Sequence, residues 1–177
     1  MNYFYWALGI AIVWFLSHQA GRLDRLHHRI DVTEAALDGH LGRRAGIVAE
    51  LSNVSTLDPV TSAVLAQVSH DALAAEPHEL IVRIEIENEL SDVLADTFGD
   101  EQDVLELISD PVARQLMNEL AIVCARVNLS HAFHTEAVGD CINLRRQWIV
   151  RIFHLAGHAQ LPTTFKLHSD VPTGLVD

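Results

Sequence analysis

The stretch YFYWALGIAIVWFL, Tyr3 to Leu16, dominates the fold prediction because it contains no charged residue, and the first charge after it is Arg22. With Met1, Asn2 and Ser17 the uncharged run is at the lower limit for crossing a hydrocarbon core of about 30 Å at ~1.5 Å per residue. Aromatic residues lie at both ends of the run, as in the interfacial belts of a membrane helix. We therefore predict a transmembrane anchor over residues 1–20, with interfacial contacts from Tyr3, Trp6, Trp14, Phe15, Arg22 and Arg25.

Two alternatives for this stretch are a signal peptide and a buried helix of a soluble protein, and the sequence argues against both. A cleaved signal peptide would carry basic residues before the apolar run and small residues after it, whereas MNYFYW has no basic residue and SHQAG is a poor cleavage site. A buried helix of a soluble protein would need a polar face, which positions 3–16 lack.

The basic residues near the run predict its orientation. None precedes it, and Arg22, Arg25 and Arg29 follow it. The positive-inside rule then places the N-terminus outside and the rest of the chain in the cytoplasm, as a single-pass protein of a bacterial inner membrane. Lys166 is the only lysine among the 12 lysines and arginines. Such an excess of arginine over lysine indicates a bacterial genome of high GC content.

The formal net charge of the chain is −12, from 24 acidic and 12 basic residues. Such a balance argues against binding to a phosphate backbone, so nucleic acid is not an expected partner. No second stretch is apolar enough for a span, and about 155 residues remain for one domain after the anchor.

The anchor is predicted to continue unbroken into a long amphipathic helix. Apolar residues recur at spacings of 3, 4 and 7 and mark one stripe of a helix. The stripe consists of Leu23, Leu26, Ile30, Leu37, Leu41, Val48 and Leu51.

Three further helices are predicted from capping residues and helix breakers. Asp58-Pro59 begins a helix over about 60–75, because aspartate caps the free amides and proline fits the first turn. A helix over about 78–98 ends at a glycine, and Asp110-Pro111 repeats the capped start for a long helix over 111–156. The fold class is therefore all-α: a transmembrane helix followed by an up-and-down antiparallel four-helix bundle over 21–157 and an irregular tail over 158–177.

Two segments allow alternatives. The alternation of Val82, Ile84 and Ile86 is also compatible with a short strand, although no second strand is available to pair with it. The acidic segment 100–110 has room for one or two helical turns. Either a solvated face or a surface for a cation or a basic partner is formed by the longer acidic run, which consists of Asp92, Asp96, Asp100, Glu101, Asp103, Glu106 and Asp110.

One constellation of histidines and cysteines could ligate a metal. Cys124, His131, His134 and Cys141 lie within about 100° of arc on one helix, and His131 and His134 form the best-spaced pair. The alternative is that these are half-buried core positions, which is the commoner arrangement. The two cysteines are ~25 Å apart along a straight helix, so they are expected to be free thiols.

The segment RRQWIVRIFHL, Arg145 to Leu155, mixes arginines with large apolar residues. It is predicted to return to the bilayer surface or to dock a protein partner at the end of the bundle. The contact residues of this segment are predicted to be Arg145, Arg146, Trp148, Arg151 and Phe153. Sequence motifs for acyl transfer, nucleotide hydrolysis and thiol exchange are missing from the chain, so no catalytic residue and no cofactor is predicted.

Three segments give the chain a resemblance to the LemA family of bacterial single-span membrane proteins: Arg22 to Leu51, EIENELSDVL (Glu85 to Leu94), and NELAIVCARVNLSHAFHTEAVGDC (Asn118 to Cys141). Where that family has two Tyr-Asn pairs, this chain has His134-Thr135 and Cys141-Ile142. The resemblance implies a cytoplasmic helical bundle on one anchor, with no established enzymatic activity, cofactor or catalytic residue.

The function predicted from the sequence is that of a non-enzymatic, membrane-anchored scaffold or accessory subunit. Its partners would be membrane lipid and another membrane-associated protein or complex, such as a respiratory assembly, and the small residues Ala7, Gly9 and Ala11 would let the span pack against other spans. The competing prediction is a metal-binding or sensory membrane protein that uses His131 and His134.

Overall fold

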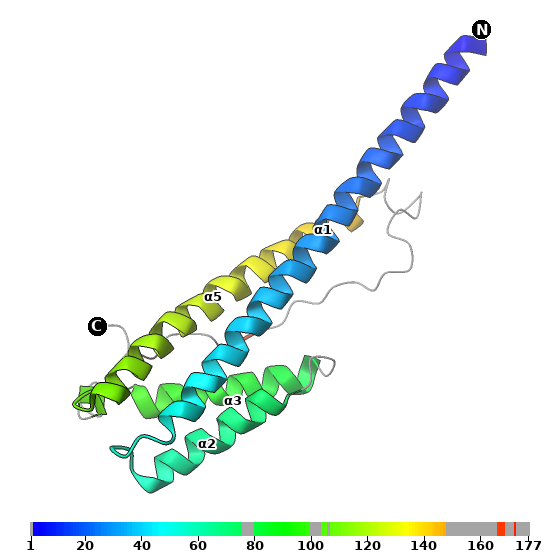
Figure 1. Cartoon of the computed structure of the whole chain (residues 1–177). Helices are drawn as coiled ribbons and strands as arrows, with labels where there is room; N and C mark the ends of the chain where they lie inside the picture. The colour runs from blue at the N-terminus through cyan, green and yellow to red at the C-terminus, as the bar shows by residue number, and fades with distance from the viewer. Residues whose placement is uncertain are drawn as a thin grey trace. The chain divides into compact units, whose positions relative to one another are not determined.

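The computed structural model of the protein describes residues 2–75, 80–99, 104–105, 107–147, 166–168 and 172. Regular structure in these residues is helical throughout and comprises α1 (Asn2–Leu51), α2 (Pro59–Ala74), α3 (Leu80–Phe98) and α5 (Pro111–Arg145) (Figure 1). The predicted all-α class and the helical bundle are confirmed. The alternative strand over 82–86 is wrong, because these residues lie in α3, whose buried Leu90, Leu94 and Phe98 recur every four residues.

The chain divides into two compact units. The proximal unit comprises Met1–Glu34 and Phe133–Thr164, and the body comprises Ala35–Ala132 and Phe165–Asp177. Helix α1 is continuous from Asn2 to Leu51, as predicted, and contributes its first part to the proximal unit and its second part to the body.

In the proximal unit, α1 and α5 run antiparallel. His27 contacts Cys141 and Thr33 contacts His134, so the position on α5 falls as the position on α1 rises. The buried residues between the helices are Leu23, Ile30, Ala137, Val138, Cys141 and Leu144. At the edge of this small core, Arg29 forms exposed ion pairs with Glu136 at 3.4 Å and Asp140 at 3.2 Å.

The body holds the larger core, to which α1, α2, α3 and α5 all contribute. Both predicted capped starts are present. Asp58 Oδ1 accepts from the amides of Val60 at 2.9 Å and Thr61 at 3.0 Å, and Asp110 Oδ1 accepts from the Val112 amide at 2.8 Å. These bonds satisfy amides that have no partner inside the helix, so the two prolines mark true helix starts.

The two predicted helix ends at glycines have different outcomes. Helix α3 ends at Phe98 before Gly99, as predicted, and a Cβ on Gly99 would lie 2.4 Å from the carbonyl oxygen of Ala95. Helix α5 ends at Arg145, and Arg146 and Gln147 are not helical, so the predicted helix is interrupted there, and the rest of its predicted course to Ala156 lies outside the described residues. Its last turn tightens as the Gln147 amide donates to the Leu144 carbonyl at 3.1 Å, the short-range bond of a 3₁₀ turn, and residues from 148 to 165 lie outside the described part.

No helix in the described part of the chain combines the length and the hydropathy that crossing a membrane requires. The predicted transmembrane anchor over residues 1–20 therefore has no support from the helices. Polar residues enclose the run closely, with Asn2 before it and Ser17, His18 and Gln19 after it, and they lower the mean hydropathy of any window of spanning length.

Candidate functional site

The N-terminal end of α1 exposes large apolar side chains on all its sides. The predicted anchor residues Tyr3, Trp6 and Trp14 are 89%, 74% and 71% exposed, and Phe15 is exposed as well. Arg22 and Arg25 follow on the same helix and are also exposed. A helix that is apolar all round is normally surrounded by other apolar groups. This end of α1 is therefore a candidate site of interaction.

A groove of about 820 Å³ runs along one side of this segment. Gly9 is one of its lining residues, and an added Cβ at Gly9 would meet no atom within 4 Å. The groove is lined by Tyr5, Trp6, Gly9, Ile10, Val13, Trp14 and Ser17. A glycine between aromatic side chains lets the backbone of a second helix approach closely.

The structure does not assemble the four predicted metal ligands. The Nδ1 atom of the buried His134 lies 3.4 Å from Thr33 Oγ1, and Cys141 Sγ lies 3.8 Å from His27 Nε2. Cys124 is buried in the core of the body, and His131 is half-buried. In the part of the chain that the structure describes, no group of three or more histidine, cysteine or acidic side chains could hold a metal ion. The described residues thus give the metal-binding alternative no support.

Both cysteines are free, as predicted, and both are buried. Burial raises the pKa of the Cys124 thiol, and the Arg44 guanidinium opposes that shift in part. Burial likewise raises the pKa of the Cys141 thiol, against a weaker opposing effect of Arg145. The thiolate is the nucleophilic form of cysteine, and nucleophilic cysteines have a lowered pKa. Although Cys141 contacts His27, its pKa is raised, so it does not have this property of a nucleophilic cysteine.

The predicted basic and aromatic contact segment is only partly described. Arg145 is the last residue of α5 and is half-buried, and Arg146 is exposed in the turn that follows. Trp148, Arg151 and Phe153 lie outside the described residues, so their predicted contacts with lipid or a partner stay predictions.

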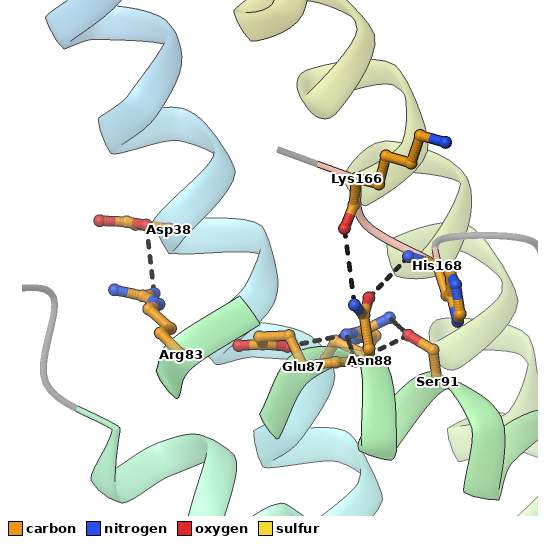
Figure 2. Close-up of polar contacts among 8 residues, drawn as sticks. Asp38, Arg83, Glu87, Asn88, Ser91, Lys166 and His168 are labelled. Atoms are coloured by element: carbon orange, nitrogen blue, oxygen red, sulfur yellow. Dashed lines mark hydrogen bonds and ion pairs between the residues drawn. The ribbon is translucent and has the colours of Figure 1, made fainter. Parts of the chain in front are cut away.

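Sequence reasoning missed a polar network inside the body. The guanidinium of Arg44 donates to the carboxylate of Glu87 at 2.7 Å, to the backbone oxygen of Glu87 at 3.1 Å and to the hydroxyl of Ser91 at 2.9 Å. Ser91 in turn donates to the Glu87 carbonyl at 2.8 Å. Figure 2 shows the network where α3 faces α1. The Arg44 Nε is buried and has no hydrogen-bond partner among the described residues.

Helix α3 makes two more polar contacts. Arg83 forms an ion pair with Asp38 of α1 at 3.1 Å. On another side of α3, the amide of Asn88 holds the backbone of residues 166–168 (Figure 2). The side chain of Leu167 is buried in the core of the body.

The segment Glu85 to Leu94 contains a sequence signal for the polar contacts of α3. It places polar residues at i and i+4 on two neighbouring faces of a helix, Glu87 with Ser91 and Asn88 with Asp92. The partners of these residues, Arg44 and residues 166–168, are more than forty positions away in sequence. Neither pairing is visible in local spacing.

Comparison with known protein families, curated proteins and solved structures finds no match to this chain. The resemblance to the LemA family accordingly stays a prediction.

Proposed function

We propose that this chain is a non-enzymatic scaffold or accessory subunit that is anchored to a bacterial membrane by the N-terminal end of α1 and docks a protein partner through its helical bundle. One observation carries the proposal. From Tyr3 to Phe15, large apolar side chains are exposed around the whole circumference of α1. Leaving that surface in water costs about 25 cal/mol for each Å² of apolar area, so an apolar surrounding is strongly favoured.

Lipid is the surrounding that fits this segment best. Its aromatic residues lie at both ends and its aliphatic residues between them, which is the distribution expected across a bilayer leaflet or core. The basic residues Arg22, Arg25 and Arg29 follow the segment and favour a cytoplasmic body.

The length of the segment sets how deeply it can enter. Residues 3–16 extend over about 21 Å as a helix, less than the ~30 Å core. A short span is accommodated by local thinning of the bilayer or by association with other spans. The groove at Gly9 supports association, because a second helix can approach the backbone there.

The outer face of α5 supports the docking of a protein partner. Ile122 and Leu129 are 53% and 56% exposed and lie seven residues apart. Ala125 and Ala132 are exposed between and after them, so the four residues follow the alternating spacing of three and four that packs helix against helix. A helix of a membrane-associated partner, such as a subunit of a respiratory assembly, fits this face.

Two matched substitutions test the proposal. Ile10→Asp places a charge in the exposed N-terminal segment, and Ile122→Asp places the same charge on the exposed face of α5. A charge in the centre of an inserted helix costs roughly 2.5–3.5 kcal/mol on the insertion scale. In flotation with liposomes, we expect the wild type and Ile122→Asp to float and Ile10→Asp to remain at the bottom. Flotation of Ile10→Asp at the wild-type level, or sedimentation of the wild type, would contradict the anchor.

The second arm measures partner docking with each purified protein added as bait to detergent-solubilised membranes. Affinity capture followed by mass spectrometry should recover the same proteins with wild type and Ile10→Asp and lose them with Ile122→Asp. Equal recovery with all three proteins would contradict docking through α5. Labelling of a cysteine added at position 2 with an impermeant reagent tests whether the N-terminus lies outside.

A further inference from the structure

The described C-terminal residues lie against the body as a short non-helical segment. Lys166, Leu167 and His168 are far from α3 in sequence, yet they contact its exposed side. Leu167 is 9% exposed and belongs to the same core cluster as Leu90 and Leu94 of α3. An apolar side chain from a distant segment thus completes the core of the bundle at this point.

The amide of Asn88 recognises the backbone of this segment. Its Nδ2 donates to the carbonyl of Lys166 at 3.5 Å, and its Oδ1 accepts from the amide of His168 at 2.7 Å. In an extended chain, the carbonyl of one residue and the amide of the residue two positions later point to the same side. One asparagine side chain therefore pairs with the backbone of residues 166–168 through groups that every non-proline sequence has.

Selectivity comes from the side chains on either side of that backbone contact. Leu167 enters the core, which requires an apolar residue of similar size at the central position. His168 Nδ1 lies 3.0 Å from Asp92 Oδ1 at the exposed rim, with both side chains more than half exposed. The rim contact favours a hydrogen-bond donor at the third position without contributing much affinity.

We propose that α3 carries a binding site for an extended peptide, formed by Asn88, Asp92 and the depression that holds Leu167, and that residues 166–168 are its resident ligand. The external ligand is an extended segment of a partner protein with a leucine at the central position and a donor side chain after it. Main-chain recognition combined with one side-chain pocket is the mode by which many domains bind short extended segments. Because the resident segment is covalently attached, its high effective concentration keeps the site closed until a partner segment competes. This peptide site is separate from the N-terminal anchor and from the exposed face of α5. Peptide binding at this site does not depend on entry of α1 into lipid.

The sequence offers a specific probe of the closed state. Lys166 is the only lysine, so endoprotease Lys-C can cut the full chain only between Lys166 and Leu167. A protease needs several residues around the bond in an open conformation, so the cleavage rate reports detachment of the segment. Asn88→Ala should accelerate cleavage roughly fivefold to tenfold, because it removes both backbone hydrogen bonds. Asn128→Ala, the same substitution at an exposed position of α5, should leave the rate unchanged.

The second measurement leaves the protein unaltered and adds a peptide in trans. The peptide PTTFRLHSDVPTG copies residues 162–174 with arginine in place of Lys166, so the protease does not cut it at that position. It should accelerate cleavage of the wild-type chain in a saturable manner, whereas the same peptide with serine in place of Leu167 should have no effect. Equal rates for wild type and Asn88→Ala, no acceleration by the leucine peptide, or equal acceleration by both peptides would each overturn the proposal.

Discussion

The guanidinium of Arg44 and the carboxylate of Glu87 are joined over 2.7 Å in the interior of the body, and each side chain is only 2% exposed. The pair links α1 to α3. Removing two charges from water costs about as much as their attraction returns, so such a pair contributes little net stability. We interpret its role as fixing the position of α3 along α1, because the same guanidinium also binds Ser91.

Glu87→Ala should destabilise the protein strongly, because it leaves the Arg44 charge buried without its partner. The expected loss in the free energy of unfolding is about 3–5 kcal/mol. Urea denaturation followed by circular dichroism in mild detergent measures it. A loss below about 1 kcal/mol would mean that the Arg44 side chain can reach solvent.

Two controls separate burial from charge pairing. The double variant Arg44→Met/Glu87→Leu replaces both partners with apolar groups and should recover most of the loss, since the buried charge is then absent. Glu119→Ala removes a pair of equal length, Arg43 with Glu119 at 2.7 Å, at a surface position. Its urea midpoint should remain close to that of the wild type, because exposed pairs are screened by water.

Gly99→Ala should destabilise the protein, whereas Gly42→Ala should not. A Cβ at Gly99 would lie 2.4 Å from the Ala95 carbonyl oxygen, so the backbone must shift to accept it. A Cβ at Gly42, inside α1, meets no atom within 4 Å, and alanine favours a helix by up to ~1 kcal/mol over glycine. Thermal melts of the two variants should therefore move in opposite directions from the wild type. Equal shifts in one direction would contradict the described end of α3.

The cap of α2 should make stability depend on pH in the acidic range. Hydrogen bonds from the Thr61 side chain and backbone, and from the Val60 amide, hold the pKa of Asp58 below its ordinary value of 3.8. The carboxylate therefore stabilises the folded state at pH values above 3.8, and this stabilisation is lost as the pH falls through the lowered pKa.

Asp58→Asn keeps a capping oxygen and removes the charge, so it isolates the contribution of ionisation. The difference in melting temperature between wild type and Asp58→Asn should be constant from pH 7 to pH 5 and shrink below pH 3.8. A difference that grows on acidification would contradict the cap. Asp58→Ala should melt at a lower temperature than both at neutral pH.

Cys124 and Cys141 should react slowly with a thiol reagent in the folded protein. Both are buried, and burial raises the pKa of each thiol, so the reactive thiolate is scarce. Ellman's reagent should modify both within minutes in urea and neither at a comparable rate in its absence. Ala132→Cys, at an exposed position of α5, provides a reactive control. Rapid modification of either native cysteine would contradict its burial.

Local sequence determined the helices and where most of them begin. Asp58-Pro59 and Asp110-Pro111 begin helices because a carboxylate oxygen caps free amides within three residues of itself. This interaction is local, so it can be predicted from the spacing of residues in the sequence. The long stripe from Leu23 to Leu51 predicted α1 for the same reason, since helical periodicity is local. The end of α5 escaped prediction, because the apolar pattern continues past Arg145 while the helix does not.

The surroundings of the predicted metal-ligand residues are set by contacts with another helix, which the periodicity of one helix cannot predict. His134 and Cys141 share a face of α5, but their polar atoms lie next to Thr33 and His27 of α1 instead of a common metal. Nothing in the spacing along α5 specifies which residues of α1 face it.

By itself, the sequence determined an all-helical chain with an uncharged apolar beginning, because capping, periodicity and hydropathy are properties of neighbouring residues. Only the tertiary structure decided that Arg44 is buried against Glu87 and that Asn88 holds the backbone of residues 166–168. The physical reason is that an arginine or asparagine in a helical sequence is normally solvated. Its burial becomes favourable only when packing brings donors and acceptors from distant parts of the chain together.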